Sequence, residues 1–170
     1  MRKVAGLVII SILMLEICSN PSNVEKYYRN EAEQVIKVHL KYGFADEINT
    51  FEKTCTKNLI EDGTVTIDFW FQPDDQDTII KIMEEVDFFS IRDTISFNPQ
   101  DSVAIVIDPD PGIQSLRIQY NNEDKTVYWF ATNSYPEEIE RICRLVNKIK
   151  EILNSDPEYQ SLPEPTGGYL

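Results

Sequence analysis

The stretch Gly63–Ile91 constrains the fold most, because its hydrophobic residues repeat with two different periods. From Thr64 to Phe71 every second residue is apolar, which is the pattern of a strand with one buried face. After Pro73 the apolar residues fall three or four positions apart, as they do along one side of an amphipathic helix. The residues of this helical stripe are Ile79, Ile82, Met83 and Val86. The stretch therefore predicts a strand followed by a helix, to which other strands can add.

The same patterns recur on both sides of this unit. The predicted strands are Val35–Tyr42, Thr50–Lys57, Thr64–Phe71, Val103–Ile107, Gln114–Tyr120 and Lys125–Phe130. Turn-forming residues separate them, for example Asp62-Gly63, and short turns favour antiparallel neighbours. A second helix begins at the capping box Ser134-Tyr-Pro-Glu137. Its predicted apolar stripe is Ile139, Ile142, Cys143, Val146, Ile149 and Leu153.

These elements predict one α+β domain in the order β-β-β-α-β-β-β-α, with about six mainly antiparallel strands and two packed helices. The predicted boundaries are a signal-like segment at 1–18, a polar linker at 19–34, the domain at 35–156 and a Pro/Gly-rich irregular tail at 157–170. About 150 residues are the length of one ordinary domain.

The N-terminus has the anatomy of an export signal. Arg2 and Lys3 precede a 12-residue apolar run, Val4–Leu15, which is shorter than the roughly 20 residues a membrane-spanning helix needs. Cys18 follows this run and resembles the acylated cysteine of a bacterial lipoprotein signal, although Ile17 stands where that pattern has a small residue. An uncleaved N-terminal anchor is the alternative. Both interpretations place the domain in the cell envelope, exported and membrane-anchored, facing the periplasm or the surface.

Charge argues against nucleic acid as a partner. The chain carries 16 Lys and Arg against 29 Asp and Glu, a net charge of −13. Binding to phosphates needs clustered basic residues, and the densest basic run, Arg141–Lys150, is interleaved with acidic residues. We interpret that run as the solvated side of a helix.

No catalytic or metal-binding constellation is visible. His39 is the only histidine, and it lies on the polar side of a predicted strand between lysines, where nothing indicates a triad. One histidine and cysteines without C-x-x-C spacing do not predict a zinc site. Asp108, Asp110 and Gly112 fit a turn better than a calcium loop, and the acids after Pro73 fit helix capping. We therefore expect neither a metal nor a cofactor.

Four residues stand out as candidates for other roles. Cys55 and Cys143 would be an even pair of thiols in a compartment that permits disulfides, so a bridge between them is one possibility. Cys143 also fits the apolar side of the second helix as a small hydrophobic residue. Trp70 and Trp129 are candidate binding aromatics, and packing in the core is the alternative role for both.

Several of these features together resemble a known group of proteins. The lipobox-like segment, the Glu61-Asp62-Gly63 hairpin, the helix ending in Asp87-Phe88-Phe89 and the Pro-rich tail are similar to those of small lipoproteins of Bacteroidota-type bacteria. That group has no established activity, so the resemblance implies a fold and a location and no functional residues.

Two classes of function follow from this reading. The first is a non-enzymatic envelope module that binds a protein or glycan partner. The second is an envelope hydrolase that uses a carboxylate pair, for example Asp68 with Glu84. The absence of a catalytic constellation favours the binding module.

Overall fold

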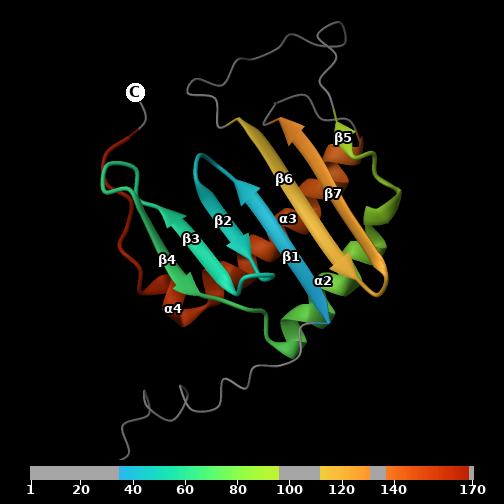
Figure 1. Cartoon of the computed structure of the whole chain (residues 1–170), viewed down its shortest axis with the longest axis horizontal. Coiled ribbons are helices and arrows are strands. Elements are labelled where there is room, and N and C mark those ends of the chain that lie inside the picture. The colour runs from blue at the N-terminus through green and yellow to red at the C-terminus, as the bar shows by residue number, and fades with distance from the viewer. Residues whose placement is uncertain (1–34, 96–111, 131–136, 169–170) are drawn as a thin grey trace, which may run out of the picture. The chain divides into compact units, whose positions relative to one another are not determined.

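The computed structural model of the chain describes residues 35–95, 112–130 and 137–168, and element labels follow Figure 1. Several predictions lie outside these residues. They are the signal-like segment 1–18 with Cys18, the linker 19–34, the strand Val103–Ile107, most of the turn before Gly112, and the start of the capping box at Ser134.

The described strands form one seven-stranded sheet in the order β4-β3-β2-β1-β6-β7-β5 (Figure 1). Their bounds are β1 Ile36–Tyr42, β2 Asp46–Asn49, β3 Thr54–Asn58, β4 Thr64–Asp68, β5 Thr94–Ile95, β6 Ile113–Tyr120 and β7 Glu123–Phe130. All neighbouring strands are antiparallel except β5, which pairs in parallel with β7. The predicted α+β class with a mainly antiparallel sheet is confirmed.

The first half of the sheet contains one more strand than predicted. The sequence predicted no strand between Val35–Tyr42 and Thr50–Lys57, whereas β2 lies there. The predicted strand Thr50–Lys57 begins only at Thr54, because a turn covers 50–53. Thr50 stabilises that turn, because its Oγ1 accepts a hydrogen bond from the Val38 amide at 2.8 Å. The β2 strand was missed because, at four residues, it is too short for alternation to show.

The helices lie on one side of the sheet, behind it in Figure 1. They are α2 Pro73–Glu85, α3 Glu137–Ser155 and the short α4 Pro157–Gln160, with a 3₁₀ turn at Phe88–Ser90. The predicted stripes face the core, but Ile82 and Cys143 are only partly buried, and Leu145 is a buried residue of α3 that the prediction left out. At the start of α2, the backbone amide of Gln72 donates to Asp75 Oδ2 at 3.3 Å, so one of the predicted capping acids has that role.

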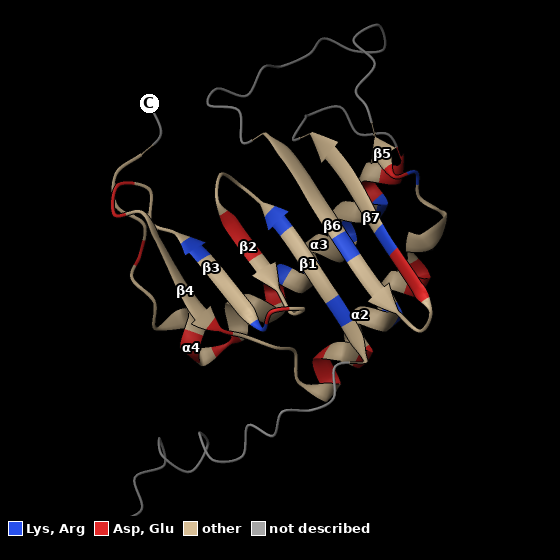
Figure 2. Ribbon diagram, in the orientation of Figure 1, with Lys and Arg blue, Asp and Glu red and all other residues tan. Residues whose placement is uncertain are grey.

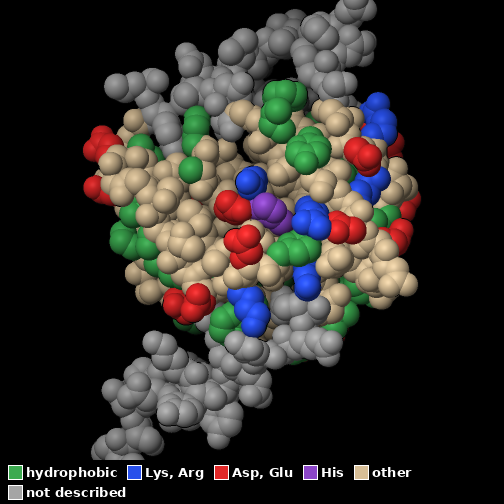
Figure 3. All heavy atoms as spheres, in the orientation of Figure 1, with side chains coloured by type: hydrophobic (Ala, Val, Ile, Leu, Met, Phe, Trp, Pro, Cys, Tyr) green, Lys and Arg blue, Asp and Glu red, His purple; other side chains and the backbone are tan. Residues whose placement is uncertain are grey.

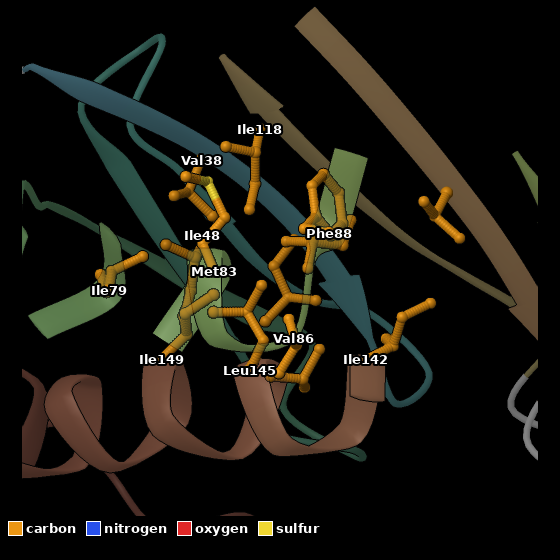
Figure 4. Packing of buried hydrophobic residues seen from close by; sticks show 14 of the residues in the cluster. Val38, Ile48, Ile79, Met83, Val86, Phe88, Ile118, Ile142, Leu145 and Ile149 are labelled. Atoms are coloured by element: carbon orange, nitrogen blue, oxygen red, sulfur yellow. The ribbon is translucent and has the colours of Figure 1, made fainter. Parts of the chain in front are cut away.

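The core fills the space between the sheet and the two long helices (Figure 4). Val38 and Ile48 point from the sheet toward Met83 of α2 and Leu145 of α3. Burying each such side chain contributes about 1.5–3 kcal/mol. Among the elements that the structure describes, none packs on the opposite side of the sheet. We call that opposite side the open face.

The C-terminal tail is more ordered than predicted. Instead of being irregular from Pro157, it begins with α4, and Thr166 then forms a parallel bridge with Ile60. The Thr166 amide donates to the Leu59 carbonyl at 3.1 Å, and Thr166 Oγ1 donates to Asp62 Oδ2 at 2.5 Å. The proline and glycine content of the tail predicted irregular structure. The contact could not be predicted locally, because it depends on a turn that lies about one hundred residues earlier in the chain.

Candidate functional site

The residues singled out from sequence occupy separate places. Trp129 is 4% exposed and lies in the core, which removes it from the candidate binding residues, whereas Trp70 is partly exposed. Cys55 and Cys143 are both free thiols, so the bridge considered for them is not formed in this structure.

The carboxylate pair considered for hydrolysis is not enclosed. Asp68 is exposed at the end of β4, and Glu84 is exposed on α2. Glycoside hydrolysis needs two carboxyl groups facing one bound sugar ring in a cleft. The three cavities described for residues 35–95, 112–130 and 137–168 are lined by neither residue.

The open face combines aromatic and basic side chains. Figure 2 shows Lys and Arg on the central strands β1 and β6, although the chain as a whole is acidic. Figure 3 shows the same face with the histidine among charged side chains and hydrophobic side chains gathered where β7 ends. The alternation of each strand places these residues there, since their neighbours in sequence are buried beneath the sheet.

Three hydrophobic side chains form what we call the apolar patch: Ile113, Tyr128 and Phe130. They are 60%, 45% and 43% exposed. Ile113 is directly opposite Phe130 in the β6–β7 register, and Tyr128 lies two residues before Phe130 on the same strand. Opposite residues and residues two apart lie on one side of a sheet, so the three side chains form a continuous surface.

A polar hollow of about 380 Å³ adjoins the apolar patch. Its lining residues are His39, Lys41, Ser115, Arg117, Thr126 and Tyr128. The walls are held in place by contacts across the strands. Arg117 donates two hydrogen bonds to Asp124, at 2.9 and 2.7 Å, and its Cζ lies 4.4 Å from the centre of the Phe51 ring. His39 contacts Glu47 at 2.5 Å. The hollow thus presents hydrogen-bonding groups that are already oriented.

A second cavity, which we call the end pocket, lies where the β1–β2 turn and β3 meet the C-terminal part of α3, α4 and the tail. Its volume is about 510 Å³. The charged and aromatic lining residues are Tyr42, Phe44, Asp46, Lys57, Lys150, Tyr159 and Glu164. It was not foreseen from the sequence, because residues 42–60 and residues 150–165, which are distant in the chain, build it together.

Burial determines the protonation chemistry around the end pocket. Burial raises the pKa of Asp46. The hydrogen bond from the Asn58 amide and the positive charges of Lys150 and Lys57 oppose that rise. Burial and the neighbouring Tyr159 and Asp46 raise the pKa of Tyr42 above its ordinary range. Both groups therefore favour their neutral forms more than exposed residues do.

Cys55 lies in the core close to Asp46. Burial, reinforced by Asp46 and Asp156, raises the pKa of the Cys55 thiol to about 12. Because the thiolate is the reactive form, Cys55 stays protonated and inert at neutral pH. The thiol therefore packs as a small hydrophobic group and takes no part in chemistry at the end pocket.

The structure supports the alternative role given for Trp129, packing in the core, and the exposed aromatic residues of β7 are its two neighbours. Tyr128, Trp129 and Phe130 are consecutive, so Trp129 faces away from the other two. The signal in the sequence was the alternation of this strand: if Val127 and Trp129 face the core, Tyr128 and Phe130 face the surface.

Comparison of the chain with protein-family models, with curated proteins and with solved structures gave no match. Among the described residues, no group of three or more His, Cys, Asp and Glu side chains is placed to hold a metal ion. In the same part of the chain, no helix combines the length and the apolar character needed to cross a membrane.

Proposed function

We propose that the protein is a non-enzymatic binding module of the cell envelope that captures a glycan on its open face. The observation that carries the proposal is the apolar patch of Ile113, Tyr128 and Phe130 beside a polar hollow. Sugar rings have apolar faces that stack on aromatic side chains and hydroxyl groups that need hydrogen-bond partners. The open face offers both kinds of group next to each other.

The rigidity of the hollow supports binding. Arg117 is held on one side by Asp124 and on the other by the Phe51 ring, so a ligand does not have to order it. Lys37 Nζ lies 5.8 Å from the centre of the same ring. Ordering one flexible side chain on binding costs about 0.5–1.5 kcal/mol, and preformed walls avoid that cost.

The site favours binding over hydrolysis. Hydrolysis requires a carboxylic acid and a second carboxylate on opposite sides of the scissile bond. The residues that line the hollow include no carboxylate, and the nearby Asp124 and Glu47 are engaged by Arg117 and His39. Bonding to Arg117 also lowers the pKa of Asp124, which makes it a poor proton donor.

Binding can be tested by affinity electrophoresis of the full chain through gels that contain bacterial polysaccharides, together with pull-down on peptidoglycan. We expect Tyr128→Ala and Phe130→Ala each to weaken retention about tenfold, because each removes a stacking ring. Val35→Ala is the control, since Val35 is 60% exposed, as Ile113 is, and adjoins Ile36, which pairs with Tyr120 at the opposite end of β6 from Ile113. Equal retention of wild type and the Tyr128→Ala/Phe130→Ala double variant would refute the proposal.

The envelope location rests on Cys18, which lies outside the described residues. Two acyl chains contribute about 0.8 kcal/mol per buried CH₂, enough for stable anchoring. Cys18→Ser should abolish labelling with a radioactive fatty acid. A variant that remains membrane-bound with residues 1–17 intact would instead support the uncleaved anchor. A cytoplasmic wild-type protein that retains Met1 would refute both.

A further inference from the structure

The end pocket holds two ammonium groups against a pair of tyrosine rings. Lys150 Nζ lies 5.0 Å from the centre of the Tyr42 ring, and Lys57 Nζ lies 5.4 Å from the centre of the Tyr159 ring. The Tyr42 and Tyr159 hydroxyls are hydrogen-bonded to each other. Each cation therefore lies over one ring of this aromatic pair, and both lysines line the same pocket.

The acidic residues near Lys57 and Lys150 leave both ammonium groups able to bind another anion. The partner of Lys57 is Glu164 of the tail, at 3.4 Å, and the Glu164 side chain is 86% exposed. Lys150 makes no ion pair with any residue that the structure describes. Asp46 faces both lysines from the sheet, and one of its oxygens already accepts the Asn58 amide at 3.0 Å. The Lys57 side chain is only 11% exposed, whereas its partner Glu164 is surrounded by water, so a ligand carboxylate can compete with Glu164 for the ammonium group.

The rest of the lining suits a hydroxylated ring. Asn58, Asn154 and Gln160 contribute amide groups, and Phe44 is an exposed aromatic side chain at the wall. The volume of about 510 Å³ lies within the range of known small-molecule sites. A carboxylate such as Asp46 repels a bare anion and accepts hydrogen bonds from hydroxyl groups.

We propose that the end pocket binds a small sugar acid, whose carboxylate replaces that of Glu164 at Lys57 and also pairs with Lys150, while its hydroxyl groups donate to Asp46. This site is separate from the open face and does not depend on the function proposed for it. Glu164 acts as an internal substitute for the ligand carboxylate when the pocket is empty.

Titration calorimetry of the full chain with glucuronate, glucose and inorganic phosphate tests the assignment. Glucuronate and glucose differ by one carboxylate, so we expect glucuronate to bind about tenfold or more tightly than glucose. Phosphate should bind more weakly than glucuronate, because it carries no hydroxylated ring. Equal affinities for the two sugars, tighter binding of phosphate, or no heat with glucuronate at millimolar concentration would each overturn the proposal.

Variants locate the ligand in the pocket. Lys150→Met should weaken glucuronate binding about tenfold, whereas Lys148→Met, on the same helix but paired with Glu151, should leave it unchanged. Glu164→Gln should strengthen binding about twofold to fivefold by freeing Lys57, and this exposed change does not threaten folding. Unchanged affinity in Lys150→Met, with a wild-type circular dichroism spectrum, would overturn the proposal. So would weaker binding by Glu164→Gln.

Discussion

The buried side chain of Gln76 in α2 links two segments by hydrogen bonds, and replacing it should destabilise the domain strongly. The side chain is 3% exposed. Its Oε1 accepts from the amides of Val35 at 2.8 Å and Ile36 at 3.4 Å, and its Nε2 donates to the Phe71 carbonyl at 3.1 Å. One residue therefore ties the start of β1 to the segment that joins β4 to α2.

The size of the effect follows from the groups left behind. Gln76→Met keeps the length of the side chain and removes every hydrogen bond. Val35 is 60% exposed, so its amide can turn to water, whereas Ile36 is fully buried and Phe71 is fully buried as a residue. Losing a hydrogen bond at a buried polar group costs about 1–3 kcal/mol, and two such groups lose theirs, so the free energy of unfolding should fall by about 2–6 kcal/mol.

Urea unfolding followed by tryptophan fluorescence measures this loss, since Trp129 is buried in the same core. The matched control is Gln160→Met, the same change at an exposed glutamine, and it should shift the free energy by less than about 0.5 kcal/mol. The reasoning fails if Gln76→Met also lies within about 0.5 kcal/mol of wild type.

Three further predictions concern the helices and the end pocket. Ile142→Asp places a charge in the core, so the free energy of unfolding should fall by about 4 kcal/mol or more in thermal melts. Arg141→Met removes hydrogen bonds of 2.6 Å each to the Val86 and Asp87 carbonyls at the end of α2, and urea unfolding should show a loss of about 1.5–3 kcal/mol. Asp46→Asn should change the pH dependence of stability. Because burial raises the pKa of folded Asp46, the folded state holds its proton more tightly, so wild type should lose stability relative to Asp46→Asn as pH rises above the ordinary value of 3.8.

Each of these predictions has a control or a contrary outcome. Ile142→Val should cost only about 1 kcal/mol, and a wild-type melting curve for Ile142→Asp would contradict the packing of α3. Arg144→Met, which breaks an exposed pair with Glu85, should cost no more than about 1 kcal/mol, and a loss equal to that of Arg141→Met would remove the special role of Arg141. A constant stability difference between wild type and Asp46→Asn from about pH 3 to about pH 7 would contradict the raised pKa.

Local periodicity in the sequence predicted the elements whose burial is one-sided. Val38 and Leu40 in β1, Leu116 and Ile118 in β6, and the α3 stripe beginning at Ile139, apart from the partly buried Cys143, are buried as their spacing indicates. Whether a residue of such an element faces the core depends only on the repeat of that element, which is 2 residues for a strand and 3.6 for a helix. The α+β class follows from those repeats alone.

Tertiary contacts decided what local patterns do not encode. Strand β2 exists because Ile48 is buried between β1 and β3, and the tail is ordered because Thr166 meets Ile60. The two binding surfaces are decided in the same way. The apolar patch depends on the pairing of β6 with β7, and the end pocket depends on Lys57 and Lys150 meeting across separate elements. The residues of such sites come together only when particular elements become neighbours in space. Packing of the whole core provides the free energy that selects those neighbours.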